Sequence, residues 1–295
     1  MTLTIAVLGT GILGRAIAER LQAAGCTVVV FNRTASKALQ LQNQGIAVVG
    51  SAEMAVSQAD CTLLLLADAA AVRSTVLTQS CCPALKGKTI VQMGTIGPNE
   101  SLQLQEAIER SAAAYCEAPV LGSVAEAKEG TLSVMVGGSD RQFAAWLPLF
   151  RLLSREPRHV GPVGSASALK LALNHLIAAE TSAFALSLGL VQRSGVSVDA
   201  FMAILRGSAL YAPTFDKKLP RLLKRDYRHP NFSTRHLLKD VRLVLQDAAS
   251  RGLSTKVLDR LPLLLEEAIA RGLGDLDYSA LFEIVNPSDP NSQHS

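Results

Sequence analysis

The chain has 295 residues and a formal net charge of +4; 48% of its residues are hydrophobic and 18% are charged. This composition supports one large or two ordinary globular domains with sizeable cores. The small charge and the scattered basic residues exclude general nucleic-acid binding, and the one basic cluster, residues 217–228, is interpreted as a solvated face. The longest apolar stretch, residues 62–72, is interrupted by Asp68 and is too short to span a bilayer, so no membrane contact is expected.

The first half of the chain alternates strand-like and helix-like segments. Strands are predicted at residues 3–8, 27–31, 61–66, 89–93, 114–119 and 131–136, with a short apolar segment at 48–49. Helices are predicted at residues 12–24, 36–44, 52–58, 69–77 and 98–113. This alternation is typical of the α/β class and predicts a doubly wound, Rossmann-type domain over residues 1–162, with a mainly parallel sheet and helices on both faces.

The pattern becomes helical after residue 161. A helix of nearly thirty residues is predicted at 165–193, followed by helices at 198–206, 233–251, 255–271 and 278–285. The long helix links the two parts and is expected to be the spine of an all-helical domain over residues 163–286, buried on most sides. Residues 287–295 are polar and predicted to form a disordered tail.

The five cysteines form no disulfide or metal pattern. They are Cys26, Cys61, Cys81, Cys82 and Cys116. None belongs to a CxxC pair or to a spaced Cys/His set, so no metal site is predicted. Their odd number and apolar surroundings are typical of reduced thiols, and the N-terminus does not resemble a signal peptide, so a cytoplasmic protein is expected.

A glycine motif joins the first strand to the first helix. It reads Gly9-Thr10-Gly11-Ile12-Leu13-Gly14. Gly9 can adopt the backbone angles of a tight turn, Gly11 leaves room for a pyrophosphate, and Gly14 lets the helix pack closely on the strand. Because the helix N-terminus offers free N–H groups and a partial positive charge, the motif predicts a dinucleotide site.

The end of the second strand indicates which dinucleotide binds. A site for NAD usually carries Asp or Glu there, whereas this chain has Asn32-Arg33-Thr34. Arg33 can pair with a 2′-phosphate, Asn32 and Thr34 can donate hydrogen bonds to it, and no carboxylate is present to repel it. The sequence therefore predicts NADP(H).

Lys170 and Asn174 lie four residues apart on the long predicted helix, and thus on one face of it. The neighbouring residues on this face are small or apolar, so a lysine there needs a partner or a chemical task. Burial lowers the pKa of a lysine toward the range useful for proton transfer. An ammonium beside a carbonyl oxygen can stabilise the charge that grows during reduction and donate a proton, while Asn174 orients the lysine and the substrate.

Four motifs in this order resemble the β-hydroxyacid dehydrogenase family over residues 3–285. They are the glycine motif; Glu117-Ala118-Pro119-Val120-Leu121-Gly122-Ser123, continuing to Ala127 and Gly130-Thr131-Leu132; Gly161-Pro162-Val163-Gly164 with Lys170 and Asn174; and Lys239-Asp240. Within the family the chain is most similar to the NADPH-dependent glyoxylate and succinic semialdehyde reductases, through Asn32-Arg33-Thr34 and residues 272–280.

The resemblance implies an enzyme that transfers hydride from NADPH to a small aldehyde acid, reversibly, with Lys170 as proton donor and Asn174 as its partner. It implies that Leu66, Ala67, Asp68, Thr95 and Lys239 bind the cofactor, together with the glycine motif and residues 32–34. It places Gly122, Ser123, Thr95, Phe232 and Asp240 at the substrate. It also points to a homodimer or homotetramer, as does the long apolar helix.

Leu121 departs from the family pattern, which commonly has serine at this position to hold the substrate carboxylate. Leucine cannot donate that hydrogen bond. An imine reductase of the same fold therefore stays an alternative, although such enzymes usually replace the lysine found here at position 170. A non-catalytic NADP-binding protein is the alternative from another class. Decarboxylating phosphogluconate chemistry is disfavoured because Leu173 stands where those enzymes typically have histidine.

Overall fold

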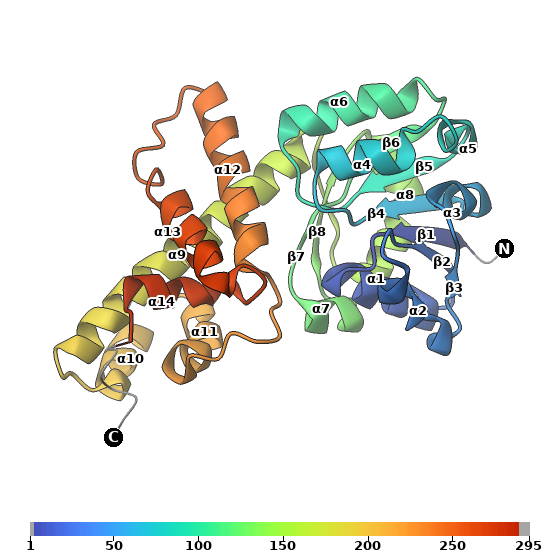
Figure 1. Cartoon of the computed structure of the whole chain (residues 1–295). Helices are drawn as coiled ribbons and strands as arrows, with labels where there is room; N and C mark the ends of the chain where they lie inside the picture. Colours follow the sequence, from blue (N-terminus) through green and yellow to red (C-terminus); the bar gives the residue numbers. More distant parts are fainter. Residues whose placement is uncertain (1–2, 289–295) are drawn as a thin grey trace. The chain divides into compact units, whose positions relative to one another are not determined.

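The computed structural model describes residues 3–288, and the chain divides into two compact units, Met1–Leu171 and Ala172–Ser295 (Figure 1). Residues 289–295, most of the predicted disordered tail, lie outside the described residues. Pro287, the first residue of that tail, is held in place, because its carbonyl accepts a hydrogen bond of 2.8 Å from Arg193. The carbonyl of Asn286, just before the tail, accepts one of 2.8 Å from Arg225.

A mostly parallel sheet forms the centre of the first unit. Its strands are β1 (Thr4–Leu8), β2 (Thr27–Phe31), β3 (Ala47–Val48), β4 (Cys61–Leu64), β5 (Thr89–Gln92), β6 (Ala114–Glu117), β7 (Val120–Leu121), β8 (Ser133–Gly137) and β9 (Arg158–Gly161). The order is β3-β2-β1-β4-β5-β6-β8-β7, with β9 pairing beside β8. The neighbouring strands from β3 to β6 in this order pair in parallel. Strand β8 runs antiparallel to β6 and β7, and β9 is parallel to β8.

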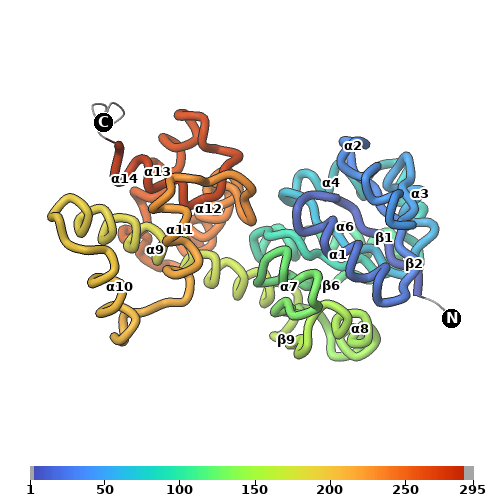
Figure 2. The backbone as a smooth tube through the Cα atoms, turned by 90° about the horizontal axis from the view of Figure 1, so that it is seen from below, coloured from blue at the N-terminus to red at the C-terminus, as the bar shows by residue number. Residues whose placement is uncertain are grey.

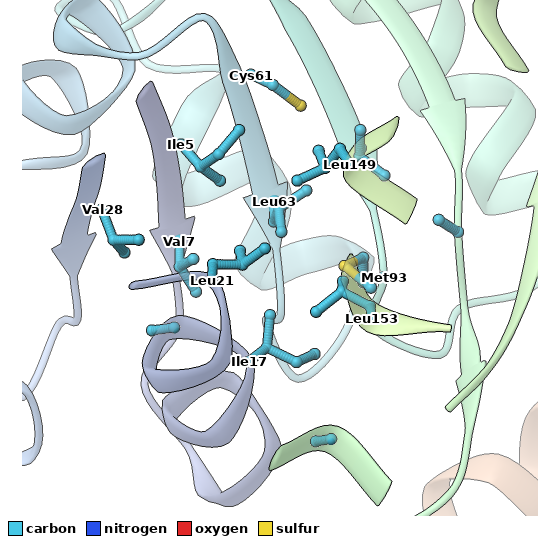
Figure 3. Packing of buried hydrophobic residues seen from close by; sticks show 14 of the residues in the cluster. Ile5, Val7, Ile17, Leu21, Val28, Cys61, Leu63, Met93, Leu149 and Leu153 are labelled. Atoms are coloured by element: carbon cyan, nitrogen blue, oxygen red, sulfur yellow. The ribbon is translucent and has the colours of Figure 1, made fainter. Parts of the chain in front are cut away.

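Helices cover both faces of this sheet, as the α/β prediction requires. They are α1 (Ile12–Ala23), α2 (Ala35–Leu39), η1 (Gln42–Gln44), α3 (Ala52–Gln58), α4 (Ala69–Val76), α5 (Cys82–Leu85), α6 (Pro98–Glu109), α7 (Val124–Glu129) and α8 (Asp140–Leu153). One core packs α1, α7 and α8 against the sheet, with Ile17, Leu21 and Leu149 facing Val7 and Leu63 (Figure 3). The other core packs α3, α4, α5 and α6 on the opposite face. The fold class is confirmed.

Two buried thiols make the stability of the first core sensitive to alkaline pH. Burial raises the pKa of the Cys61 thiol well above its ordinary value of 9.0 and raises the pKa of Cys116 to about 12. The folded protein therefore keeps two protons that the unfolded chain loses above about pH 9. Their stabilising contribution is fully present below that pH and is lost as the pH rises toward the folded pKa values.

We expect the free energy of unfolding, measured by denaturant titration, to fall between about pH 9 and pH 11. Each thiol contributes at most about 1.4 kcal/mol per pH unit. A variant carrying Cys61→Ala and Cys116→Ala is expected to show a shallower decline, and comparing slopes removes the constant effect of the deleted side-chain volume. Identical slopes in the two proteins would show that these thiols do not control alkaline stability.

The second unit is helical. After α9 (Ser165–Arg193), which starts in the first unit and is continuous over 29 residues (Figure 2), come α10 (Val198–Arg206), α11 (Pro213–Lys224), α12 (Thr234–Ser250), α13 (Leu261–Ala268), η2 (Ile269–Leu273), η3 (Tyr278–Leu281) and α14 (Phe282–Val285). Its core includes Phe184 and Leu188 of α9, Leu237 of α12, Leu265 of α13 and Leu281 of η3.

The long helix is less buried than the sequence predicts. Leu176, Leu186 and Leu190 are 50%, 64% and 67% exposed, so the expectation of burial on most sides is wrong for a single chain. By length and composition α9 could also cross a membrane, a test that core helices of soluble proteins pass as well.

Some predicted segments differ from the observed ones. The helix predicted at 36–44 is two short pieces, α2 and η1, and the one predicted at 255–271 begins only at Leu261. The strand predicted at 61–66 ends at Leu64, and the helix predicted at 98–113 ends at Glu109. The pieces α5, α7, α8, α11, β7 and β9 were not predicted individually.

The basic cluster at 217–228 is not simply a solvated face. Lys218 lies on the packed side of α11, with its side chain 12% exposed, and its ammonium is 2.6 Å from Oδ1 of Asp277. The same ammonium lies 3.9 Å from the centre of the Tyr278 ring. Burial lowers the pKa of Lys218 below its ordinary value, and the adjacent Asp277 carboxylate offsets part of this effect. The cation therefore anchors α11 to the segment before η3.

Candidate active site

The glycine motif forms the tight turn that the sequence predicts. Gly9 has a φ of +100° and its N–H donates to the Phe31 carbonyl at 2.9 Å. A Cβ atom at Gly9 would overlap the Leu65 carbonyl oxygen, and a Cβ atom at Gly14 would overlap the Gly9 carbonyl oxygen. Both positions therefore require glycine, the first for its backbone angles and the second for close approach.

The loops after β1, β4 and β5 meet at Leu65 and Leu66. Gly9 approaches the Leu65 backbone, and a Cβ atom at Gly94 would overlap the Leu66 carbonyl oxygen. The loops at 66–68 and 93–95, which carry the predicted cofactor residues Leu66, Ala67, Asp68 and Thr95, thus lie against each other at the carboxyl ends of the strands, where such sheets bind ligands. Asp68 itself caps α4, accepting a hydrogen bond of 2.7 Å from the Ala71 N–H.

The residues of this edge fit a dinucleotide. Apart from Gly11 itself and its two chain neighbours, no atom lies within 4 Å of the place where a Gly11 Cβ atom would be, which leaves the first turn of α1 open to a phosphate. The Thr10 hydroxyl is buried and has no hydrogen-bond partner among residues 3–288, so it remains available to a ligand. The N-cap Gly11 is followed by Ile12 and Leu13, the first residues of α1.

Asn32 supports the glycine turn from the end of β2. Its Oδ1 accepts from the Thr10 N–H at 3.0 Å, and its Nδ2 donates to the Thr34 carbonyl at 2.9 Å. Asn32 therefore holds the two loops together rather than presenting a free amide. Arg33 and Thr34 are exposed beside it, where a 2′-phosphate could reach them.

Lys170 and Asn174 both lie in the buried part of α9, at 9% and 3% exposure, and share one face of it. The amide nitrogen of Asn174 donates to Oδ2 of Asp240 on α12 at 2.6 Å, and Oδ1 of Asp240 lies 2.8 Å from the ammonium of Lys239. This arrangement leaves Oδ1 of Asn174 as a buried acceptor with no hydrogen-bond partner in the described part of the chain. Of the predicted pair Lys239-Asp240, Asp240 thus contacts Asn174 directly.

The predicted substrate loop carries an unexpected carboxylate. Ser123 is the N-cap of α7, and both its N–H, at 2.8 Å, and its hydroxyl donate to Oε2 of Glu126. Gly122 has a φ of +138°, and a Cβ atom there would come close to Leu132 and Glu126. Two donors that a substrate carboxylate could use are therefore already engaged by the protein.

The structure also places the predicted residues Phe232 and Thr95. Phe232 packs edge-on against Tyr278, with ring centres 5.7 Å apart, inside the second unit. Thr95 is half-buried in the loop after β5. No group of three or more His, Cys, Asp or Glu residues that could hold a metal occurs in residues 3–288.

Sequence reasoning did not single out Glu126 or the role of Glu117. The spacing of Ser123 and Glu126 is the S-x-x-E pattern of a capping box, which could have revealed the first. Glu117 lies fully buried at the end of β6 and binds the start of α9, a contact that no local pattern predicts.

Comparisons with known proteins identify the same architecture. Residues 4–161 match the family described as the NAD binding domain of 6-phosphogluconate dehydrogenase, and residues 164–285 match the one described as "NAD-binding of NADP-dependent 3-hydroxyisobutyrate dehydrogenase". Glyoxylate/succinic semialdehyde reductase 1 of Arabidopsis thaliana is 33% identical over 95% of this chain and 98% of its own length.

Solved structures with the same fold include 3-hydroxyisobutyrate dehydrogenase of Mycobacterium tuberculosis with L-serine. It has a TM-score of 0.85 and 25% identity, covering 97% of this chain and 99% of that one. An imine reductase from Myxococcus stipitatus in complex with NADP+ has a TM-score of 0.68 and 20% identity, covering 94% and 98%. The second likeness shows the fold alone.

The glycine turn on a parallel sheet, with a buried lysine and amide on the helix that follows, defines an NAD(P)-dependent oxidoreductase. More specifically, the chain belongs to the 3-hydroxyisobutyrate dehydrogenase family of β-hydroxyacid dehydrogenases. The family resemblance drawn from the four sequence motifs is therefore confirmed.

Proposed function

We propose that the protein is an NADPH-dependent reductase of small aldehydes, of the succinic semialdehyde or glyoxylate type, and that Lys170 donates the proton. The observation that carries this proposal is the oriented amide of Asn174. The amide nitrogen of Asn174 donates its hydrogen bond to Asp240. The amide oxygen of Asn174 is therefore a buried acceptor on the same helix face as the buried Lys170. An acceptor beside an ammonium suits a carbonyl that becomes a hydroxyl.

The chemistry that bound NADPH supplies is a hydride for the carbonyl carbon. As the carbonyl π bond breaks, negative charge develops on the oxygen, and the Lys170 ammonium stabilises that charge and gives it a proton. Asn174 Oδ1 accepts a hydrogen bond from the ammonium or from the new hydroxyl and so orients the group that gives or receives the proton. Solvent then returns a proton to the lysine, and the same groups in reverse roles serve the oxidation of the alcohol.

The preference for NADP(H) over NAD(H) rests on residues at the end of β2. Arg33 is exposed beside the turn that Asn32 holds against Thr10, and no acidic residue occupies positions 31–34. A guanidinium binds a phosphate through charge-assisted hydrogen bonds, whereas NAD offers only a hydroxyl there.

Succinic semialdehyde is the acid substrate to test first because the Arabidopsis relative carries that name, and the charge of the substrate loop should set how well an acid competes with a neutral aldehyde. Glu126 already accepts hydrogen bonds from both the N–H and the hydroxyl of Ser123, and the side chain of Leu121 provides no further donor. We expect Glu126→Gln to raise the ratio of kcat/KM for succinic semialdehyde over its neutral methyl ester by about tenfold, since a repelling charge is removed.

The matched control is Glu129→Gln, which removes a carboxylate from the exposed end of the same helix. It should leave the ratio for acid over ester unchanged. An unaltered ratio in Glu126→Gln would show that this carboxylate does not govern substrate charge.

An imine reductase activity is the second candidate, favoured by Leu121 and by the common fold. Lys170 weighs against it, because an ammonium is suited to protonate an alkoxide. Assaying aldehydes beside cyclic imines, with one NADPH consumed per product, separates the two activities. A protein that binds NADPH without oxidising it in either panel would be the non-catalytic alternative.

We further propose that the protein is a cytoplasmic homodimer or homotetramer that contacts neither nucleic acid nor membrane. The support for the assembly is a stripe on α9 formed by Leu176, Ala179, Ala183, Leu186 and Leu190, spaced alternately by three and four residues. This spacing suits packing against another helix, and a second copy of the chain supplies an identical apolar stripe.

We expect Leu190→Arg to convert the assembly to a smaller species without unfolding it, because Leu190 is 67% exposed in the single chain. Light scattering after gel filtration measures the mass. Leu263→Arg, at an exposed leucine of α13 outside the stripe, should keep the mass of the wild type. A monomeric wild type, or an unchanged mass in Leu190→Arg, would refute the stripe as the contact.

A further inference from the structure

Glu117 is a buried carboxylate for which the proposed reaction has no direct use. It ends β6 and is fully buried, and its register neighbours at the carboxyl edge of the sheet are Gln92 and Gly137. A Cβ atom at Gly137 would overlap Oε2 of Glu117, so the adjacent strand leaves space for the carboxylate.

Three hydrogen bonds join this carboxylate to the beginning of α9. Oε2 accepts from the Gly164 N–H at 2.8 Å and from the Ala166 N–H at 3.2 Å, while Oε1 accepts from the Ser167 hydroxyl. The first N–H groups of a helix have no partner within the helix, and its N-terminus carries partial positive charge. One side chain thus satisfies two of these groups and balances its own buried charge.

The turn before α9 has the backbone shape that this contact needs. Gly161 and Gly164 have φ values of +132° and +96°, which other residues rarely adopt. Their conformation directs the N–H groups of Gly164 and Ala166 toward β6. Glu117 and the glycine turn together hold the first turn of α9 at the edge of the sheet.

Lys170 follows this anchored turn directly. Ser167, which donates to Glu117, lies three residues before Lys170 and therefore on the same side of α9. A helix rises about 1.5 Å and rotates about 100° per residue, so any shift of its start moves the lysine by a similar amount. Displacement of a reacting group by about 1 Å can lower a rate by about 100-fold.

We propose that Glu117 is a positioning residue that sets the place of Lys170 through the first turn of α9. The inference rests on the proposed function, in which Lys170 donates the proton. Glu117 does not touch the substrate in this account. It acts at a distance by fixing the helix that carries the acid.

The test compares Glu117→Ala with Glu117→Gln and with the control Gln142→Ala. In Glu117→Gln the new amide can still accept from the backbone N–H groups through its oxygen, and its nitrogen can donate to the Ser167 hydroxyl, so the geometry is retained without the charge. Gln142 also bonds to β6, through the Tyr115 carbonyl at 2.8 Å, and caps α8 instead of α9. Gln142→Ala therefore removes a helix-capping contact to β6, as Glu117→Ala does, but it leaves α9 anchored.

We expect Glu117→Ala to lower kcat for aldehyde reduction by about 30-fold, with the Kd for NADPH changed less than about threefold. The solvent deuterium isotope effect on kcat should increase, because proton donation becomes slower. Amide hydrogen exchange should accelerate in residues 164–170. Glu117→Gln should recover most of kcat, and Gln142→Ala should keep kcat and the isotope effect of the wild type.

A Glu117→Ala variant that folds and keeps kcat within about twofold would overturn the proposal, as would a Glu117→Gln variant as slow as Glu117→Ala. Should Glu117→Ala not fold, Ser167→Ala removes a single bond and is expected to lower kcat about threefold; unchanged kcat there would also refute it. Failure of the proposed function looks different, because the wild type would then reduce no aldehyde, or Lys170→Ala would be fully active.

Discussion

Replacing Lys170 with alanine is expected to lower kcat for aldehyde reduction by about 1,000-fold, which lies in the range for loss of a general acid. The reason is the loss of the group that stabilises and protonates the developing alkoxide. Lys170 is buried beside Asn174, whose orientation Asp240 fixes, so water cannot readily take over its geometry. Stopped-flow or steady-state loss of NADPH absorbance measures the effect.

The Kd for NADPH, followed by fluorescence, should change less than about threefold in Lys170→Ala, since the glycine turn is untouched. Lys86→Ala removes an exposed lysine from the same unit and should retain full activity. If Lys170→Ala reduced aldehydes within about twofold of the wild-type rate, the lysine would have no place in the mechanism.

Replacing Arg33 with alanine is expected to lower kcat/KM for NADPH by about 100-fold while leaving that for NADH within about threefold. A guanidinium paired with a phosphate contributes charge-assisted hydrogen bonds, and no such group is present on NAD. Asn32 holds the turn in both proteins through Thr10, so the loop should keep its shape. The two coenzymes are titrated against each variant at one aldehyde concentration.

The control for this experiment is Arg73→Ala, which removes an arginine of α4 whose guanidinium bonds to Gln103 at 3.0 Å. It should not alter the ratio between the coenzymes. Equal losses with NADPH and NADH in Arg33→Ala, or a wild type that prefers NADH, would contradict the assignment to NADP(H).

Local sequence patterns predicted the elements whose apolar spacing is regular. The helices observed at Ser165–Arg193 and Val198–Arg206 and the strand at Thr27–Phe31 have the predicted bounds. In these segments the periodicity of the side chains and the packing of the fold favour the same structure. The glycine turn was predictable for the same reason, because strand, turn and helix are contiguous.

Helices with internal proline were the hardest to predict. Pro148 lies inside α8 and Pro220 inside α11, where proline normally indicates a helix end. Tertiary packing overrides that preference: Leu149 and Phe150 of α8 and Leu222 of α11 are buried in the cores of their units. The short strand β7 has only two residues, too few to show a period.

The sequence indicates which residues form the candidate site, but it does not indicate which of them contact one another. Lys170 and Asn174 can be recognised from the sequence because they share a helix face, which is a local property. The bond from Asn174 to Asp240 joins residues 66 positions apart, and the bonds from Glu117 to α9 span 47 to 50 positions. Such pairings depend on the folded chain, and they determine which atoms remain free for chemistry.

The most direct test of the account is the oxidation of NADPH by the wild-type protein with succinic semialdehyde, its methyl ester and a cyclic imine. The account predicts that the aldehydes are reduced, with one alcohol formed per NADPH consumed, and that the imine is reduced far more slowly. Reduction of the imine alone, or no oxidation of NADPH by any of the three, would contradict it.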